Sequence, residues 1–316
     1  MRLVDFDEYK EFIKKNNKIV LEGQEIILDE MEVKRFEPTE EELTDISTTV
    51  WSFPVRGSWA THKGDYRGNW PPQLVRAFLI RYTKVGDTVL DQMVGSGTTC
   101  IECKLLGRNC IAVDIEYDAV MLTLHRLYQL EKALERFKIF KMNKIGNIEV
   151  QKIFNSWIKV YQGDARNLSE IKDESIDASL FHPPYFSIIK YGKHVKGNLS
   201  CAKNVKEYLK MMDEVIKECF RVLKPGSYCG ILVGDTRIKK HFVPLSHHIL
   251  ELFLKNGFIL VEEVIKIQHK MKTTREIWEK KKVDFLLIYH EKFFIFRKPK
   301  SKSEYKDFEY SSYIEL

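Results

Sequence analysis

The sequence predicts an α/β fold, a doubly wound and mostly parallel sheet of seven strands that includes a C-terminal antiparallel hairpin strand. From Thr88 onward, short apolar runs of strand length alternate with segments whose apolar residues have helical spacing. Continuous apolar strands that alternate with helices are typical of a parallel sheet covered on both faces. The first strand passes into the first helix through a glycine turn, "GSG", at residues 95–97. Open sheets of this Rossmann-like kind bind their ligands at the carboxyl ends of the strands.

The expected strands are apolar runs bounded by turn residues. They cover residues 88–93, 109–115, 158–165, 176–184, 227–235 and 258–268, with a closing hairpin at 283–299. The expected helices have apolar residues at helical spacing, and several end near glycine or proline. They cover residues 72–83, 95–107, 117–137, 205–226 and 244–257.

The composition fits a globular chain with a full core, since 44% of the 316 residues are hydrophobic and 30% are charged. The net charge of +6 is compatible with a nucleic-acid partner. The apolar runs are only of strand length and the N-terminus lacks a secretory hydrophobic region, so we expect no membrane span and a cytoplasmic location. Six scattered cysteines indicate reduced thiols, and the lone CxxC at Cys100 and Cys103 argues against a metal site.

The segment "LDQMVGSGTT", residues 90–99, combines features that suit a ligand. Gly95 and Gly97 allow a sharp turn and a close approach of the backbone. The following helix offers free N–H groups, and Asp91 offers a carboxylate at the end of the strand. A phosphate would require Lys or Arg here, and the dinucleotide fingerprint G-x-G-x-x-G is absent. A carboxylate that faces outward suits a ligand with an ammonium group and hydroxyls, such as S-adenosylmethionine.

Two more acids end the next two strands. Asp114, in "AVDI", suits ribose hydroxyls, and Asp164, in "QGDARN", is placed to accept from an adenine amine. A strand-end Asp alone is more often a turn or cap residue, but three in register beside a glycine turn indicate one ligand site. We assign the neighbouring residues of these turns to the same cofactor site: Met93, Ser96, Thr98, Ile115 and Ala165.

Four motifs carry a resemblance to a known family: "VLDQMVGSGTT", "HPPY", "VLKPGSYCGILVGD" and "HEKFFIFRKP". Together they resemble the amino-methyltransferases of DNA, which act on cytosine N4 or adenine N6, over residues 51–299. The resemblance implies S-adenosylmethionine as cofactor and the class I methyltransferase fold. It also implies that an aromatic stretch with Phe53 and Trp70 covers the methionine end of the cofactor. The family's corner reads Asp, Asn or Ser before Pro-Pro-Tyr, so His182 is a departure from the pattern.

The corner "HPPY", residues 182–185, has a chemical explanation of its own. A base amine is a poor nucleophile because its lone pair is delocalised into the ring, and two fixed hydrogen-bond acceptors would free that lone pair. The Pro183 carbonyl is one acceptor, since Pro184 restricts its direction. The His182 ring, if neutral, is the other, and it also borders the cofactor site. Tyr185 is expected to stack on the base. The alternative is that His182 only packs at the strand end and the prolines only end the strand.

Two basic runs are expected on loops at the same edge of the sheet, at about residues 186–206 and 266–282. We expect their cations to contact phosphates of the nucleic acid, although such runs are often only solvated. The residues assigned to this role are Lys190, Lys193, Lys196, Lys270, Lys272 and Arg275. The remaining boundaries are an N-terminal arm or lid at 1–48, the catalytic domain at 49–300 with an insertion at about 133–157, and a tail at 301–316.

We therefore expect a site-specific methyltransferase that uses S-adenosylmethionine and acts on the exocyclic amine of a base flipped out of double-stranded DNA. Cytosine N4 is favoured over adenine N6, because a neutral His is closer to Ser than to Asp. The alternatives are an RNA guanine-amine methyltransferase and a nucleic-acid-binding protein that keeps the fold without catalysis. A cognate restriction endonuclease is a possible partner, and a monomer or homodimer is expected.

Overall fold

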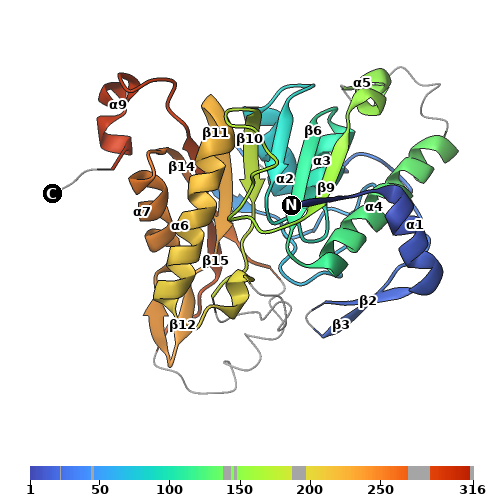
Figure 1. The fold of residues 1–316 in the computed structure, drawn as a ribbon, viewed down its shortest axis with the longest axis horizontal. Helices are drawn as coiled ribbons and strands as arrows, with labels where there is room; N and C mark the ends of the chain where they lie inside the picture. Colours follow the sequence, from blue (N-terminus) through green and yellow to red (C-terminus); the bar gives the residue numbers. More distant parts are fainter. Residues whose placement is uncertain are drawn as a thin grey trace.

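The computed structural model describes residues 1–21, 23–43, 46–137, 144–145, 148–186, 197–269 and 285–313. Its central feature is a nine-stranded sheet with the order β1-β9-β6-β5-β10-β11-β15-β14-β4 (Figure 1). The strands of this sheet are β1 (Arg2–Val4), β4 (Val50–Ser52), β5 (Thr88–Asp91), β6 (Asn109–Asp114), β9 (Ile158–Gln162), β10 (Ile176–Phe181), β11 (Leu223–Val233), β14 (Ile259–Ile267) and β15 (His290–Arg297).

The strand directions confirm the doubly wound fold. Strands β9, β6, β5, β10 and β11 form a continuous parallel ladder. Strand β15 is antiparallel to both of its neighbours, β11 and β14. The chain proceeds from β5 outward through β6 and β9, and then returns to the other side of β5 with β10 and β11. The point of reversal lies between β5 and β10, which is where such sheets bind ligands.

Two edge strands make the sheet larger than the seven strands expected. β1 pairs antiparallel with β9, and β4 pairs parallel with β14. Each edge strand has three residues, which is too short to give a periodic signal in the sequence. β1 belongs to the segment predicted as an N-terminal arm or lid, so part of that segment lies within the sheet. A role of the remainder as a lid stays a prediction.

Helices cover both faces of the sheet in two groups (Figure 1). Their bounds are α1 (Phe6–Lys15), α2 (Pro72–Tyr82), α3 (Thr98–Leu105), α4 (Tyr117–Arg136), α5 (Val150–Asn155), α6 (Val205–Val222) and α7 (Leu245–Lys255). Buried residues of α2, α3 and α4 share one hydrophobic cluster, and those of α6 and α7 share another. Adjacent residues Val89 and Leu90 of β5 belong to the first and the second cluster respectively. Successive side chains of a buried strand point to opposite faces, so the strand is covered on both.

Smaller elements complete the described chain. Three two-stranded ribbons pair β2 (Lys18–Leu21) with β3 (Gln24–Ile27), β7 (Lys144–Ile145) with β8 (Ile148–Glu149), and β12 (Thr236–Ile238) with β13 (His241–Val243). Short helical turns are η1 (Glu40–Glu42), η3 (Leu199–Cys201), α9 (Glu304–Asp307) and η4 (Glu309–Ser311). The predicted insertion at 133–157 thus holds the end of α4, the ribbon β7–β8 and α5.

The closing hairpin predicted at 283–299 is a single strand in the described part of that segment, residues 285–299. β15 begins only at His290 and inserts between β11 and β14. Its antiparallel partners therefore come from earlier in the chain. Among the described helices, none combines the length and the apolar character needed to cross a bilayer.

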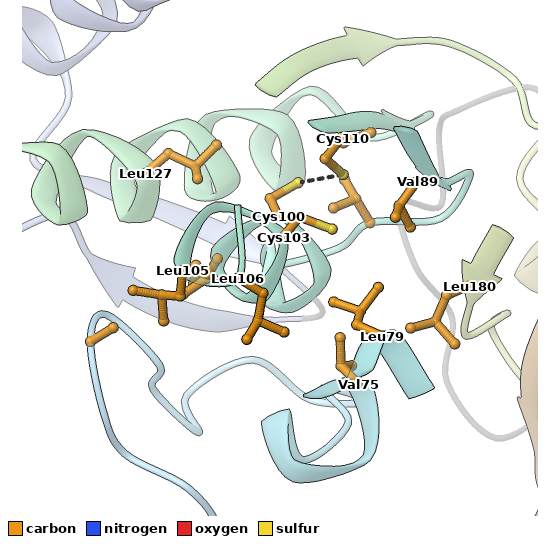
Figure 2. Packing of buried hydrophobic residues seen from close by; sticks show 14 of the residues in the cluster. Val75, Leu79, Val89, Cys100, Cys103, Leu105, Leu106, Cys110, Leu127 and Leu180 are labelled. Carbon is orange, nitrogen blue, oxygen red and sulfur yellow. Dashed lines mark hydrogen bonds between the residues drawn. The ribbon is translucent and has the colours of Figure 1, made fainter. Parts of the chain in front are cut away.

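The cysteines of the CxxC sequence are core residues of α3 (Figure 2). The Sγ atom of Cys100 lies 3.7 Å from that of Cys110 on β6, and both side chains are buried. Burial raises the pKa of the Cys100 thiol, which disfavours the thiolate that metals bind. Over the described ranges, no group of His, Cys, Asp or Glu side chains is arranged to hold a metal ion.

Candidate active site

A pocket opens at the carboxyl ends of the central parallel strands, beside the point where the chain order reverses. It encloses about 730 Å³ of space between its atoms, counted out to its open mouth. Its lining comes from the aromatic stretch before α2, the glycine turn, the ends of β6 and β9, the corner after β10, and residues 197–199 before α6. The lining residues are Tyr66, Gly68, Asn69, Trp70, Gln92, Met93, Val94, Gly95, Ser96, Asp114, Ile115, Glu116, Asp164, Ala165, His182, Pro184, Gly197, Asn198 and Leu199.

The glycine turn is held in a conformation that favours glycine. Gly95 and Gly97 have φ angles of 54° and 84°, in the left-handed region. A Cβ atom on Gly95 would lie 3.0 Å from the Tyr66 ring, and one on Gly97 would lie 3.1 Å from Thr123. The turn is fixed to the next strand because Gly95 N–H donates to the Asp114 carboxylate at 2.8 Å. The left-handed φ angles and these close neighbours explain why both positions need a residue without a side chain.

Asp91 and Asp114 have different positions although both end a strand. Asp91 is 1% exposed and does not line the pocket, and its carboxylate accepts from the Met93 N–H at 3.1 Å and from the Thr99 hydroxyl. Burial raises the pKa of Asp91 to about 7. Asp114 lines the pocket, and burial raises its pKa to about 6. Thus Asp91 does not face the pocket, contrary to the expectation from the sequence, whereas Asp114 does.

Two further carboxylates line the pocket. The Asp164 carboxylate accepts from Arg166 Nη2 at 2.6 Å and from the Arg166 backbone N–H at 2.9 Å. Glu116, which the sequence analysis did not single out, accepts from Asn198 Nδ2 at 2.7 Å. Burial raises the pKa of Glu116. Three acids on one wall favour a ligand that carries positive charge or hydroxyl donors.

The aromatic stretch forms a strap, which we define as residues 53–71, across one side of the pocket. It contributes Tyr66, Gly68, Asn69 and Trp70 to the lining. The Thr98 hydroxyl donates to Asn69 Oδ1 at 2.7 Å, so this residue of the glycine turn holds the strap. Phe53, at the start of the strap, is buried against Trp51 and does not line the pocket.

Buried charges of the helices fix the strap in place. The fully buried Glu102 of α3 accepts from Trp59 Nε1 at 2.7 Å, from His62 Nε2 at 2.8 Å and from Arg76 Nη1 at 3.0 Å. Arg126 of α4 pairs with Asp65 and donates to the Ser96 carbonyl at 3.0 Å. These bonds connect the strap to both helices and to the glycine turn.

The Pro-Pro corner enters the pocket from the end of β10. His182 and Pro184 line the pocket, and Trp70 of the strap stacks on the His182 ring, with centroids 5.5 Å apart and planes 21° apart. The His182 ring is partly exposed to the pocket and otherwise enclosed. This enclosure lowers its pKa to about 4, so the ring is neutral at pH 7.

Tyr185 points away from the pocket lining and into a buried polar chain. His182 Nε2 lies 2.6 Å from the Tyr185 hydroxyl, which donates to Glu291 Oε1 at 2.8 Å. Glu291 Oε2 accepts from Lys266 Nζ at 2.7 Å. Glu291 and Lys266 belong to β15 and β14, far from the corner in sequence. Trp70 stacks on the His182 ring, whereas the Tyr185 ring meets it edge-on, with centroids 5.1 Å apart and planes 64° apart.

The structure thus brings the two predicted halves of the site into one pocket. The predicted residues that line it are Met93, Gly95, Ser96, Asp114, Ile115, Asp164, Ala165, His182 and Pro184. The predicted residues that do not line it are Phe53, Asp91, Gly97, Thr98, Pro183 and Tyr185. The predicted phosphate contacts all lie outside the described residues: Lys190, Lys193, Lys196, Lys270, Lys272 and Arg275.

Several lining residues were missed by the sequence analysis. Gln92 and Val94 lie within the quoted glycine segment, and Glu116 follows Asp114 by two residues, so a wider window around each motif would have included them. Tyr66 and Asn69 lie in the strap, whose density of aromatic and glycine residues was the available signal. Asn198 and Leu199 lie within the first basic run, but neither residue was singled out because neither is basic.

Comparisons with known proteins show to which family the chain is similar. A family model described as DNA methylase, N6_N4_Mtase, matches residues 2–124 and 176–314. The chain is 38% identical over 80 residues to the Type II methyltransferase M.MjaII of Methanocaldococcus jannaschii, covering 25% of this chain and 14% of that protein. It is 29% identical over 182 residues to the uncharacterized protein MJ1233 of the same organism, covering 57% and 50%.

A third relative is named as an enzyme that acts on tRNA. The tRNA (guanine(10)-N2)-dimethyltransferase of Methanocaldococcus jannaschii is 29% identical over 149 residues, covering 46% of this chain and 34% of that protein. The chain spans half or less of the length of each of these relatives. The family model, in contrast, matches most of the chain on both sides of the predicted insertion. The chain therefore belongs to the DNA methylase family N6_N4_Mtase.

Proposed function

We propose that this protein transfers a methyl group from S-adenosylmethionine to the exocyclic amine of a base in DNA. The observation that carries the proposal is that one pocket joins the glycine turn, with Gly95 and Ser96, to the corner, with His182 and Pro184. A methyl donor and a base amine must meet in line, and a shared pocket allows this proximity. Membership of the DNA methylase family supports the same reaction class and the same cofactor.

The pocket fits S-adenosylmethionine, which supplies an electrophilic methyl group when it is bound. Asp114 and Glu116 can accept from ribose hydroxyls, and Asp164 can accept from the adenine amine. Gln92 provides an independent test of the fit. It is 1% exposed and lines the pocket, and its Oε1 is buried with no hydrogen-bond partner among the described residues. A buried acceptor without a partner is costly, and the ammonium group of the ligand can satisfy it.

The corner is proposed to activate the amine. The Pro183 carbonyl and the neutral His182 ring accept hydrogen bonds from the two N–H groups, which frees the lone pair of the nitrogen for attack. Trp70, stacked on His182, is placed to limit rotation of the ring. A base in a duplex reaches this pocket only if it is flipped out of the stack.

We propose cytosine N4 as the target over adenine N6. The support is the charge state of the corner, since the low pKa of His182 leaves this position uncharged at pH 7, as Ser would be and Asp would not. The match to a tRNA guanine methyltransferase favours RNA as the second candidate substrate. A cognate restriction endonuclease remains a proposal that rests on the family alone.

A basic hairpin is proposed as one surface that contacts the DNA backbone. The ribbon β12–β13 follows the carboxyl end of β11, which is parallel to β10, so it emerges at the same edge as the corner (Figure 1). Lys239, Lys240 and His241 are exposed at its tip. Its two lysines have φ angles of 49° and 73°, a conformation that non-glycine residues rarely adopt. Strained backbone that presents cations at a site edge is consistent with a binding role.

Mass spectrometry of nucleosides tests the proposed function. Duplex DNA and tRNA are incubated separately with the protein and S-adenosylmethionine that carries a trideuterated methyl group. We expect trideuterated N4-methylcytosine from DNA. N6-methyladenine would change the target base, and label in tRNA alone would favour the second candidate. Label in neither nucleic acid, together with measurable cofactor binding, would overturn methyl transfer.

A further inference from the structure

Among the described residues, two Lys–Glu pairs join strands β14 and β15, and one of them contacts the corner through Tyr185. Lys266 and Glu291 form the inner pair, with Nζ and Oε2 2.7 Å apart and side chains 14% and 8% exposed. Lys292 and Glu263 form the outer pair at 2.8 Å, with side chains 13% and 37% exposed. The two lysines are equally buried, so the pairs differ in the carboxylate: Glu291 is buried and Glu263 is partly exposed. Burial of both charges of an ion pair is expensive, so the inner pair calls for a reason beyond stability.

The inner pair is connected to the corner through Tyr185. Burial alone would raise the pKa of Glu291, but Lys266, His182 and Tyr185 outweigh it and lower the pKa to about 2, so Glu291 is a carboxylate at pH 7. A carboxylate can only accept hydrogen bonds, so the Tyr185 hydroxyl must donate its single proton to Glu291. The Tyr185 oxygen then has only lone pairs left for His182, 2.6 Å away. His182 Nε2 must therefore carry a proton.

We propose that Glu291 is a positioning residue that acts through Tyr185 to fix His182 in one orientation and one tautomer, with the proton on Nε2 and the lone pair on Nδ1. Lys266 keeps Glu291 ionised. Tyr185 therefore donates to Glu291, and His182 Nε2 donates to Tyr185. The effect of this tautomer on catalysis rests on the proposed function. A neutral histidine can accept from a base amine only through its unprotonated nitrogen, and a mixture of tautomers would reduce the competent fraction.

The groups around His182 have opposing effects on its charge. Enclosure of the ring and the Lys266 ammonium favour the neutral form, whereas the Glu291 carboxylate and a backbone contact with Gly68 of the strap favour the protonated form. Enclosure prevails, so the ring stays neutral. Trp70 stacks on the ring from the strap and restricts its rotation. Tyr185 makes the hydrogen bond to Nε2 and donates its own proton to Glu291. These two residues therefore favour the tautomer with the proton on Nε2, against the contact with the Gly68 backbone.

Nuclear magnetic resonance of the cofactor-free protein tests the tautomer directly. The full chain is labelled with ¹⁵N-histidine, and the His182 signals are identified by their absence in His182→Gln. We expect wild-type His182 to be protonated on Nε2 at pH 7. In Glu291→Gln the new amide can donate to Tyr185, which then donates to Nε2, so the proton moves to Nδ1. Tyr185→Phe removes the connection and gives a mixture of tautomers.

The outer pair supplies the matched control, because Glu263→Gln removes a carboxylate from the same two strands without touching the corner. This variant is expected to keep the wild-type tautomer. Methyl transfer in Glu291→Gln is expected to fall at least tenfold in kcat, with KM for DNA and the cofactor Kd unchanged. If His182 shows the same tautomer in wild type and Glu291→Gln, or carries its proton on Nδ1 in wild type, the inference is wrong. If the tautomers follow the expectation but no nucleic acid is methylated, the proposed function fails alone.

Discussion

The two halves of the pocket are built in different ways. The cofactor half is local: Gly95 of the turn is bound to Asp114 at the end of the next strand, and the residues involved lie within one β–α–β segment. The corner half is non-local: His182 depends on Tyr185, on Glu291 of β15 and on Lys266 of β14. The strap, with Trp70, joins the two halves.

This difference determines which substitutions should affect each half of the pocket. Backbone geometry shapes the cofactor half, so glycine and strand-end acids are its vulnerable positions. A buried chain of side-chain hydrogen bonds shapes the corner half, so single polar atoms decide the state of His182. Substitutions in the first half should act on binding, and those in the second on the rate of transfer.

The largest effect is expected from His182→Ala. Loss of a positioned acceptor at the reacting amine costs about 10²- to 10⁴-fold in rate. The affinity for S-adenosylhomocysteine, measured by calorimetry, should change much less, because the carboxylates that line the pocket are intact. His247→Ala, on the exposed side of α7, is the control and should behave as wild type. If His182→Ala transfers methyl groups at a rate within about threefold of wild type, the corner takes no part in the mechanism.

The buried Asp91 should dominate a second measurement, the pH dependence of stability. Its folded pKa of about 7 lies above the ordinary value of 3.8, so the folded chain keeps a proton that the unfolded chain has lost. The contribution of Asp91 to the free energy of unfolding is therefore complete at low pH. It falls as pH rises from about 4 to 7, by about 1.4 kcal/mol per pH unit at most. Asp91→Asn removes this contribution to the pH dependence of stability.

Urea titrations at pH 5 and pH 8 check this prediction. Relative to wild type, Asp91→Asn should gain about 3 kcal/mol of unfolding free energy between the two pH values. Asp177→Asn, which removes a carboxylate at the other end of the neighbouring strand β10, is the control. Parallel pH profiles of wild type and Asp91→Asn would show that Asp91 is ionised in the folded protein.

A smaller effect is expected at the glycine turn. Gly97→Ala combines a left-handed φ angle of 84° with a Cβ contact of 3.1 Å to Thr123. Gly86→Ala has a similar φ angle of 88° but open space around the new atom. Both variants should lose about 1–2 kcal/mol of stability from backbone strain. Only Gly97→Ala should also weaken cofactor binding, by about tenfold, and equal cofactor affinities would contradict the role of the turn.

The smallest effect is expected at the basic hairpin. Lys239→Asn with Lys240→Gly removes both charges and supplies residues that suit the positive φ angles of a two-residue hairpin turn. The salt dependence of DNA affinity should become shallower by about 0.9 for each phosphate that the variant no longer neutralises. Lys14→Ala with Lys15→Ala on α1, at the opposite side in Figure 1, should leave the slope unchanged. An unchanged slope in the hairpin variant would exclude this surface.

The sequence predicted the central strands and part of the lining of the cofactor half of the pocket. The glycine turn and the strand-end residues Asp114 and Asp164 are adjacent to strong apolar runs, so position along the chain predicts position in the pocket. Asp91 shows the limit of that argument. A strand-end carboxylate can turn inward as well as outward, and the hydroxyl of Thr99 makes the inward position favourable.

The corner half needed the structure. The sequence predicted that His182 lies near the cofactor turn, but nothing along the chain links Tyr185 to Glu291 or Lys266. Those contacts exist because β15 inserts between β11 and β14, a register that periodicity does not specify. The edge strands β1 and β4 were missed for a related reason, since their three residues carry no period.

A crystal structure with S-adenosylhomocysteine and a DNA duplex is the most direct test of the account. We predict that the nucleoside of the ligand lies against Asp114 and Asp164, and that a flipped base presents its amine to His182 and the Pro183 carbonyl in the same pocket. A ligand bound away from the glycine turn, or a base held elsewhere while the corner stays closed behind Trp70, would contradict it.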